Sequence, residues 1–193
     1  MALRLWRPLA ERGNVYAQGS VALMYYNGQG VPPDFAEAVK WYRMAAEKGY
    51  SGAQNNLGFM YATGQGVPQD DAKAAVWFRL AAEQRDARAQ SNLGVMYFNG
   101  RGVPQDFTEA VKWYREAARH GHTDAQYNLG VMYANGRGVS QDFVQAHLWF
   151  SLAAAAGTEG AGTIRETVAR LMNPEQIAES QHMAHEWMAK YQQ

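Results

Sequence analysis

The 193-residue sequence has no cysteine, no excess of either charge and no long apolar run. Without cysteine there are no disulfides, no thiolate metal ligands and no cysteine nucleophile. Eighteen basic residues balance 18 acidic ones, so the chain lacks the basic surface that supplies most of the affinity for nucleic acid. The longest nearly apolar stretch, residues 148–156, is too short to span a bilayer. Because 47% of the residues are hydrophobic and only 19% are charged, a folded protein is expected.

What the sequence does contain is a repeat with a period of 36 residues. Tryptophan recurs at that interval at Trp41, Trp77, Trp113 and Trp149. The pentapeptide VKWYR stands at residues 39–43 and again, unchanged, at 111–115. A single closed core gives no reason for such a period, whereas a solenoid of stacked units requires it.

Each unit contains two stretches whose apolar residues have helical spacing. In the second stretch they fall at i, i+3, i+4, i+7 and i+8, as in Ala38, Trp41, Tyr42, Ala45 and Ala46. This is the stripe of an amphipathic helix with one buried face. Every unit is therefore predicted to be a pair of helices, and the fold to be all-α.

The segment between the two helices is equally regular. Two glycines, as at Gly28 and Gly30, permit the positive φ at which the first helix stops, and the following proline prevents its continuation. An aspartate such as Asp34 then caps the second helix. Arg85 stands where the other units have glycine after the second helix, and a positive φ there would cost roughly 1 kcal/mol.

Together these features resemble the Sel1-like repeat, an α/α relative of the tetratricopeptide repeat. The resemblance rests on Ala-Gln-x-x-Leu-Gly-x-Met-Tyr at residues 89–97, followed by Gly-x-Gly-Val-Pro-x-Asp and Ala-x-x-Trp-x-x-x-Ala-Ala. It implies a right-handed α/α superhelix that binds other proteins. We expect a single domain over residues 1–193, composed of a truncated second helix at 1–12, four repeats at 13–48, 49–84, 85–120 and 121–156, and a divergent capping helix pair at 157–193.

The chain opens halfway through a unit. The face formed by Ala2, Leu5, Trp6 and Leu9 matches that of a second helix without its partner. We therefore expect an upstream segment, such as a signal peptide or an anchor, and a location in the bacterial periplasm or outside the cell, with the cytoplasm left open. An exposed apolar face at this end predicts a monomer or a weak dimer.

No constellation of residues indicates catalysis, a cofactor or a metal site. His182, His185 and Glu186 lie on one predicted helix, but the zincin order is absent, and a solvated terminal helix explains them better. None of the serines lies in a nucleophile elbow. The sequence therefore predicts a protein that is not an enzyme.

The first helix of each unit carries the predicted binding residues. At 100° per residue from the core residue Leu57, Asn55 and Phe59 fall about 140° to 200° away. In α-solenoids of this type the first helices line the concave side, so these faces predict a groove with aromatic anchors. The predicted groove residues are Tyr26, Asn55, Phe59, Val95, Phe98, Tyr127 and Val131.

A row of asparagines, Asn56, Asn92 and Asn128, flanks this stripe. The resemblance implies that these amides hold the backbone of an extended peptide, since an amide both donates and accepts. The alternative is that they cap loops or bridge adjacent helices.

The function predicted from these features is binding of a peptide or protein partner in the concave groove, as an adaptor or scaffold in envelope or secretion processes. One alternative is an immunity protein that neutralises a cognate secreted toxin. A further alternative is a cell-wall-related enzyme or a β-lactam-binding protein.

Overall fold

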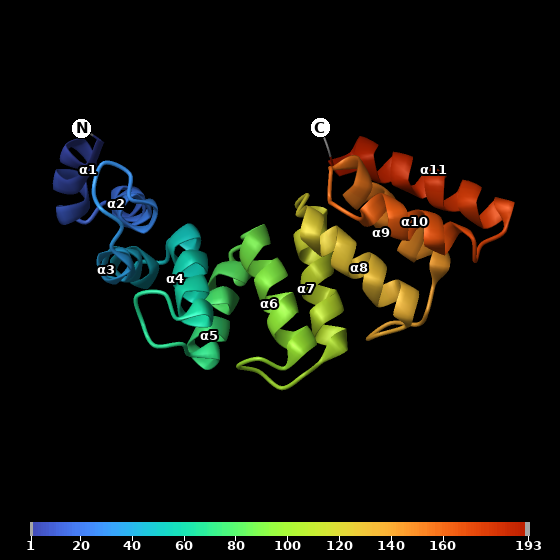
Figure 1. Cartoon of the computed structure of the whole chain (residues 1–193), viewed down its shortest axis with the longest axis horizontal. Helices are drawn as coiled ribbons and strands as arrows, with labels where there is room; N and C mark the ends of the chain where they lie inside the picture. Colours follow the sequence, from blue (N-terminus) through green and yellow to red (C-terminus); the bar gives the residue numbers. More distant parts are fainter. Residues whose placement is uncertain (1, 192–193) are drawn as a thin grey trace. The chain divides into compact units, whose positions relative to one another are not determined.

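The computed structural model describes residues 2–191, apart from the Ala2 side chain, and within them helices joined by loops are the only regular secondary structure. The Ala2 side chain, predicted on the N-terminal apolar face, thus lies outside the described residues. The prediction of an all-α fold is confirmed (Figure 1). The helices are α1 (Ala2–Glu11), α2 (Val15–Asn27), α3 (Phe35–Glu47), α4 (Ser51–Thr63), α5 (Asp71–Glu83), α6 (Ala87–Asn99), α7 (Phe107–Arg119), α8 (Thr123–Asn135), α9 (Phe143–Ala155), α10 (Ala161–Ala169) and α11 (Pro174–Tyr191).

The chain forms two compact units. The first comprises the described residues up to Ala89 together with Arg101–Pro104, and the second comprises Gln90–Gly100 and the described residues from Gln105 onward. In the first unit α2 packs against α3 and α4 against α5, and in the second α8 packs against α9. Figure 1 shows this succession of helix pairs from blue to red.

Small residues allow the two helices of a pair to approach closely. An added Cβ at Gly58 would lie 2.9 Å from the ring of Phe78, and one at Gly130 would lie 2.7 Å from the ring of Phe150. Such distances leave no room for a side chain, so glycine inside the first helix is required by the aromatic residue on the second helix.

Aspartate caps begin the second helix of each pair. The side chains of Asp34, Asp70 and Asp142 each accept a hydrogen bond from the backbone N–H three residues later, which satisfies one of the free donors of the first turn. Arg85 has φ of +66°, as its position in the repeat predicted, and among the described residues it is the only non-glycine with positive φ.

A buried glutamine near the start of a repeat's first helix joins that repeat to the helix before it. Gln18 is fully buried, and its Nε2 donates to the carbonyl of Ala10 at 3.0 Å; Gln54 does the same to Ala46 at 3.1 Å. These carbonyls lie in the last turns of α1 and α3, where the usual donor four residues later is missing, and each also accepts from the backbone N–H of the glycine three residues later, Gly13 or Gly49. The Ala-Gln of the repeat motif is therefore a link between successive helix pairs.

The glycine loops also lock onto the preceding helix pair. In the first unit an added Cβ at Gly102 would overlap the carbonyl of Asp71, so only glycine fits there. The neighbouring Arg101 binds Asp71 with two hydrogen bonds, of 2.7 and 3.1 Å, and donates to the carbonyl of Ala62 at 3.2 Å. In the second unit Gly138 approaches the carbonyl of Phe107 in the same way.

Candidate functional site

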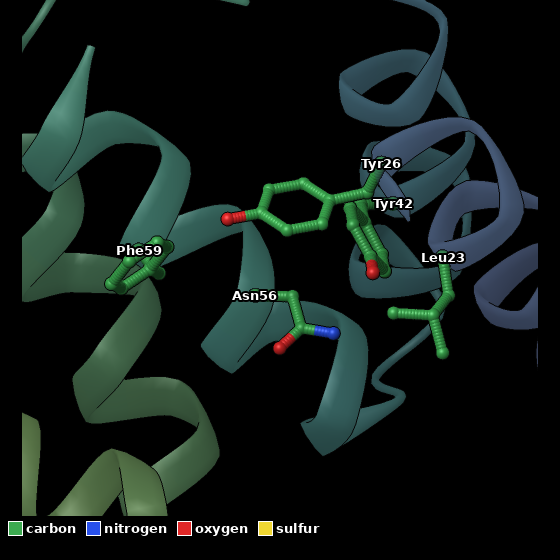
Figure 2. A pocket seen from close by; sticks show the side chains of 5 residues that line it. All are labelled: Leu23, Tyr26, Tyr42, Asn56 and Phe59. Carbon is green, nitrogen blue, oxygen red and sulfur yellow. The ribbon is translucent and has the colours of Figure 1, made fainter. Parts of the chain in front are cut away.

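A pocket in the first unit lies between the first helices of two successive pairs. It has a volume of about 120 Å³ and is lined by Leu23 and Tyr26 of α2, Tyr42 of α3, and Asn56 and Phe59 of α4. Figure 2 shows Phe59 at one side, Tyr26 above, Leu23 at the other side, and Asn56 facing the hydroxyl end of Tyr42. The sequence-predicted residues Tyr26, Asn56 and Phe59 are therefore brought together.

Two walls of this pocket are apolar and open to solvent. Leu23 is 44% exposed and Phe59 is 42% exposed. Tyr26 is held between them, because its ring packs edge-on against Phe35 with centroids 5.3 Å apart and its hydroxyl donates to Oε1 of Gln65 at 2.9 Å. The aromatic wall is thus fixed in place before any partner binds.

The floor of the pocket is a polar pair. Tyr42 is buried, and burial raises the pKa of its hydroxyl to about 12, while a hydrogen bond from the Asn56 side chain acts in the opposite direction. Asn55 donates to Oδ1 of Asn56 at 3.3 Å. An amide carries two N–H donors and two acceptor lone pairs, so Asn56 keeps one of each for a partner.

A more polar hollow of about 190 Å³ continues from this pocket. It shares Leu23, Tyr42 and Asn56 with the first and extends to Tyr50 and Arg88. The guanidinium of Arg88 forms a 3.5 Å ion pair with Asp86, and the Arg88 side chain remains 59% exposed. The surface therefore changes from apolar at Phe59, through the amide of Asn56, to cationic at Arg88.

The second unit repeats the arrangement at smaller size. A pocket of about 40 Å³ is lined by Phe98, Tyr114, Asn128, Val131 and Met132. The first four stand 72 residues after Tyr26, Tyr42, Asn56 and Phe59, so the same four places of the repeat build both pockets. Phe98 packs against Phe107, and the guanidinium of Arg137 lies over both rings.

Four predicted site residues lie elsewhere. Asn55, expected opposite the core, is instead only 5% exposed, and its Nδ2 donates to Oδ1 of Asn56. Tyr127 packs edge-on against Phe150 at 5.5 Å and belongs to the hydrophobic cluster of the second unit. Val95 and Asn92 are half-buried and line neither pocket.

Sequence reasoning missed the tyrosines of the pocket floor. Tyr42 and Tyr114 were assigned to the buried stripe of the second helix, and both are indeed only 2% exposed. The available signal was the hydroxyl itself, since a tyrosine in an otherwise alanine-rich stripe must direct a polar group somewhere.

Two further features of the described residues concern metal ligands and membrane spans. Across residues 2–191 histidine and carboxylate side chains do not gather in threes that would hold a metal ion. His182 forms an exposed ion pair with Glu186 at 3.3 Å, as suits a solvated helix. No helix in the described part of the chain is long and apolar enough to cross a membrane.

Comparison with known proteins agrees with the repeat architecture. A family model described as the Sel1 repeat matches residues 15–50, 51–86, 87–122 and 123–158. The comparison with curated proteins found no match.

Three solved structures show the same likeness. A protective antigen present in uropathogenic Escherichia coli strains and displaying an SLR fold is 35% identical, with a TM-score of 0.91; the match covers 98% of this chain and 41% of that one. A Sel1 repeat protein from Oxalobacter formigenes is 36% identical, with a TM-score of 0.71, 76% of this chain and 60% of that chain covered. Helicobacter pylori cysteine rich protein B is 26% identical, with a TM-score of 0.55, and the match covers 68% of this chain and 95% of that one. The chain therefore spans less than two thirds of the first two relatives.

Proposed function

Because this chain belongs to the Sel1 repeat family, whose repeats mediate protein–protein interaction, we propose that it binds an extended peptide segment of a partner protein through the first unit. The contact surface is the pocket of Leu23, Tyr26, Asn56 and Phe59 with its continuation toward Arg88. The observation that carries the proposal is that two large apolar side chains stand exposed on either side of an amide held in a fixed position.

The apolar walls supply the affinity. Leu23 and Phe59 are each more than two fifths exposed, and covering that remaining part with a partner's apolar group stabilises a complex by roughly 0.6–1.3 kcal/mol per side chain. Because Tyr26 is already held by Phe35 and Gln65, little side-chain freedom is lost when a partner binds.

The side-chain amide of Asn56 orients the backbone of the bound peptide. Its remaining donor and acceptor suit one peptide group of an extended backbone, independent of the partner's side chains. The row of asparagines implied by the family resemblance would act in this way at Asn56 and, in the second unit, at Asn128, which lines the equivalent pocket.

The biological setting that we propose is an adaptor or scaffold in envelope or secretion processes, outside the cytoplasm. Neutralisation of a secreted toxin would use the same surface against a folded enzyme instead of a peptide. Cell fractionation checks the location, and the peptide experiment below separates the two kinds of partner.

The test is selection of binding peptides from a random display library, followed by measurement of Kd by fluorescence polarisation. We expect Phe59→Ala to weaken binding of a selected peptide by roughly tenfold or more, and Asn56→Ala to weaken it whatever the peptide's sequence. Val76→Ala removes an apolar side chain that is 57% exposed on α5, and as a matched control it should leave Kd unchanged.

Equal Kd values for the wild type, Phe59→Ala and Val76→Ala would place the interface elsewhere and reject this site. If no peptide is selected but a folded protein is captured in a Phe59-dependent way, the partner is a folded domain and the extended-peptide proposal is wrong.

A further inference from the structure

A separate cavity lies at the C-terminal end of the second unit, between α9, α10 and α11. Its volume is about 440 Å³, within the usual range for small-molecule sites. In Figure 1 these three helices lie together, with α11 in red alongside the orange α9 and α10. Among the residues that line it are His147 and Ser151 of α9, Arg165, Glu166 and Ala169 of α10, and Met188 of α11.

The repeat itself explains why space opens here. In earlier repeats the corresponding places hold an arginine and a tyrosine that bind each other: Arg43 donates to the hydroxyl of Tyr61 at 2.9 Å, and Arg115 to that of Tyr133 at 2.8 Å. The same register leads to Ser151 and Ala169, both of which line the cavity. Two large side chains have therefore been replaced by two small ones.

Two further replacements make the cavity polar. Arg165 stands where the earlier first helices have the fully buried leucines Leu57, Leu93 and Leu129. His147 stands where the earlier second helices have the buried residues Val39, Ala75 and Val111. His147 is buried at its place, whereas 37% of the Arg165 side chain is exposed, so the guanidinium stands at the boundary between the cavity and solvent.

The histidine is held in a fixed orientation. His147 is 4% exposed, and its Nδ1 lies 2.8 Å from Oγ of Ser180, which is fully buried. Because His147 lines the cavity and Nδ1 is engaged by Ser180, Nε2 is the ring nitrogen left for a ligand. Burial and the neighbouring Arg165 lower the pKa of His147, so the ring is neutral in the empty cavity at neutral pH.

The charge of Arg165 is only weakly balanced within the protein. The ion-paired carboxylate is that of Glu166, 3.9 Å away, which also lines the cavity; the Glu166 side chain is 67% exposed and that of Arg165 is 37% exposed. A carboxylate entering the cavity can accept two parallel hydrogen bonds from the guanidinium, which is a stronger pairing than this long contact. On α11, Ile177, Ala184 and Met188 add apolar side chains to the lining of the cavity.

We propose that this cavity binds a small amphipathic carboxylate, with its charged group on Arg165, within reach of His147 and Ser151, and its hydrocarbon body against α11. The site is distinct from the peptide surface of the first unit, so either proposal can fail without the other.

Octanoate is the probe, with n-octanol and octylamine as uncharged and cationic controls of equal chain length, and binding is measured by isothermal titration calorimetry. The wild type should bind octanoate saturably, bind octanol more weakly and not bind octylamine. Arg165→Leu, which restores the residue of the earlier repeats, should weaken octanoate binding by about tenfold or more and leave octanol binding unchanged.

Ala169→Tyr fills the cavity with the side chain that the earlier repeats carry, and should abolish binding of both octanoate and octanol. Arg170→Leu removes an exposed charge from the end of α10 outside the cavity and is the matched control for Arg165→Leu. Circular dichroism confirms that each variant is folded. No saturable octanoate binding by the wild type, or equal affinity in the wild type, Arg165→Leu and Ala169→Tyr, would overturn the proposal.

Discussion

At the scale of single residues, departures from the repeat are as informative as the repeat. His147 is buried at a place where three earlier units carry valine or alanine, and it needs Ser180 as a hydrogen-bond partner. A buried neutral imidazole resists protonation, because the charged form would lose its hydration. Burial is the largest cause of the lowered pKa of His147, and the positive charge of Arg165 adds to it.

This predicts a loss of stability in mild acid. Since the pKa of His147 is lowered in the folded protein, the stabilisation is complete above the unfolded value of 6.5, and it is lost as pH falls from there toward the folded pKa. Below pH 6.5 the unfolded chain takes up a proton that the folded chain does not. The free energy of unfolding therefore falls by up to about 1.4 kcal/mol per pH unit. Urea unfolding should be measured for the wild type and for His147→Val/Ser180→Ala between about pH 7.5 and pH 5, the range in which histidine titrates. The free energy of unfolding should fall less on acidification in the variant than in the wild type. Parallel curves would contradict this account.

At the scale of elements, the loop between the two helices of a pair packs against the preceding pair and holds the two pairs together. Gly30, Gly66, Gly102 and Gly138 share one place in the repeat and all have positive φ. At the last three an added Cβ would overlap backbone atoms of the pair before, whereas at Gly30 no atom lies within 4 Å. The loop glycine therefore has two separable roles, one conformational and one steric.

Gly102→Ala and Gly30→Ala measure these roles separately. Both pay the cost of positive φ, roughly 1–2 kcal/mol, and Gly102→Ala must also push the carbonyl of Asp71 away, for a total of roughly 2–4 kcal/mol. We expect urea denaturation to show the larger decrease in the free energy of unfolding for Gly102→Ala. Equal decreases would mean that the loop does not lock the two pairs together.

At the scale of the whole molecule, helix α1 of the first unit carries an exposed apolar face. Leu5 is 69% exposed, Trp6 40% and Leu9 44%, so three large apolar side chains stand exposed on one helix. The weak dimer expected from the sequence stays a prediction.

Sedimentation velocity over a range of concentrations checks it. Since a twofold dimer buries the same residue from both copies, Leu5→Gln should weaken dimerisation by about tenfold or more. Leu171→Gln changes an isolated leucine that is 62% exposed beyond α10, and it should leave the association unchanged. A wild type that stays monomeric at every concentration would reject the prediction.

The candidate site could be predicted in part, and the limit has a physical reason. Helical arithmetic placed Tyr26, Asn56 and Phe59 near one another because they lie on one side of consecutive first helices. It misplaced Asn55, because a single helix's angles do not show how far a neighbouring helix covers each side. Tyr42 escaped notice because its ring is core while its hydroxyl reaches the pocket.

What the sequence by itself determined is the repeat: its period, the helix pairs, the aspartate caps and the positive φ of Arg85, all of which follow from local preferences and spacing. Only the tertiary structure decided which exposed side chains share a pocket and where space remains. The cavity beside His147 is an example, since Ser151 and Ala169 stand 18 residues apart and their small size matters only because α9 and α10 pack together. Packing between helices sets the volume that side chains leave empty, and no local pattern records that volume.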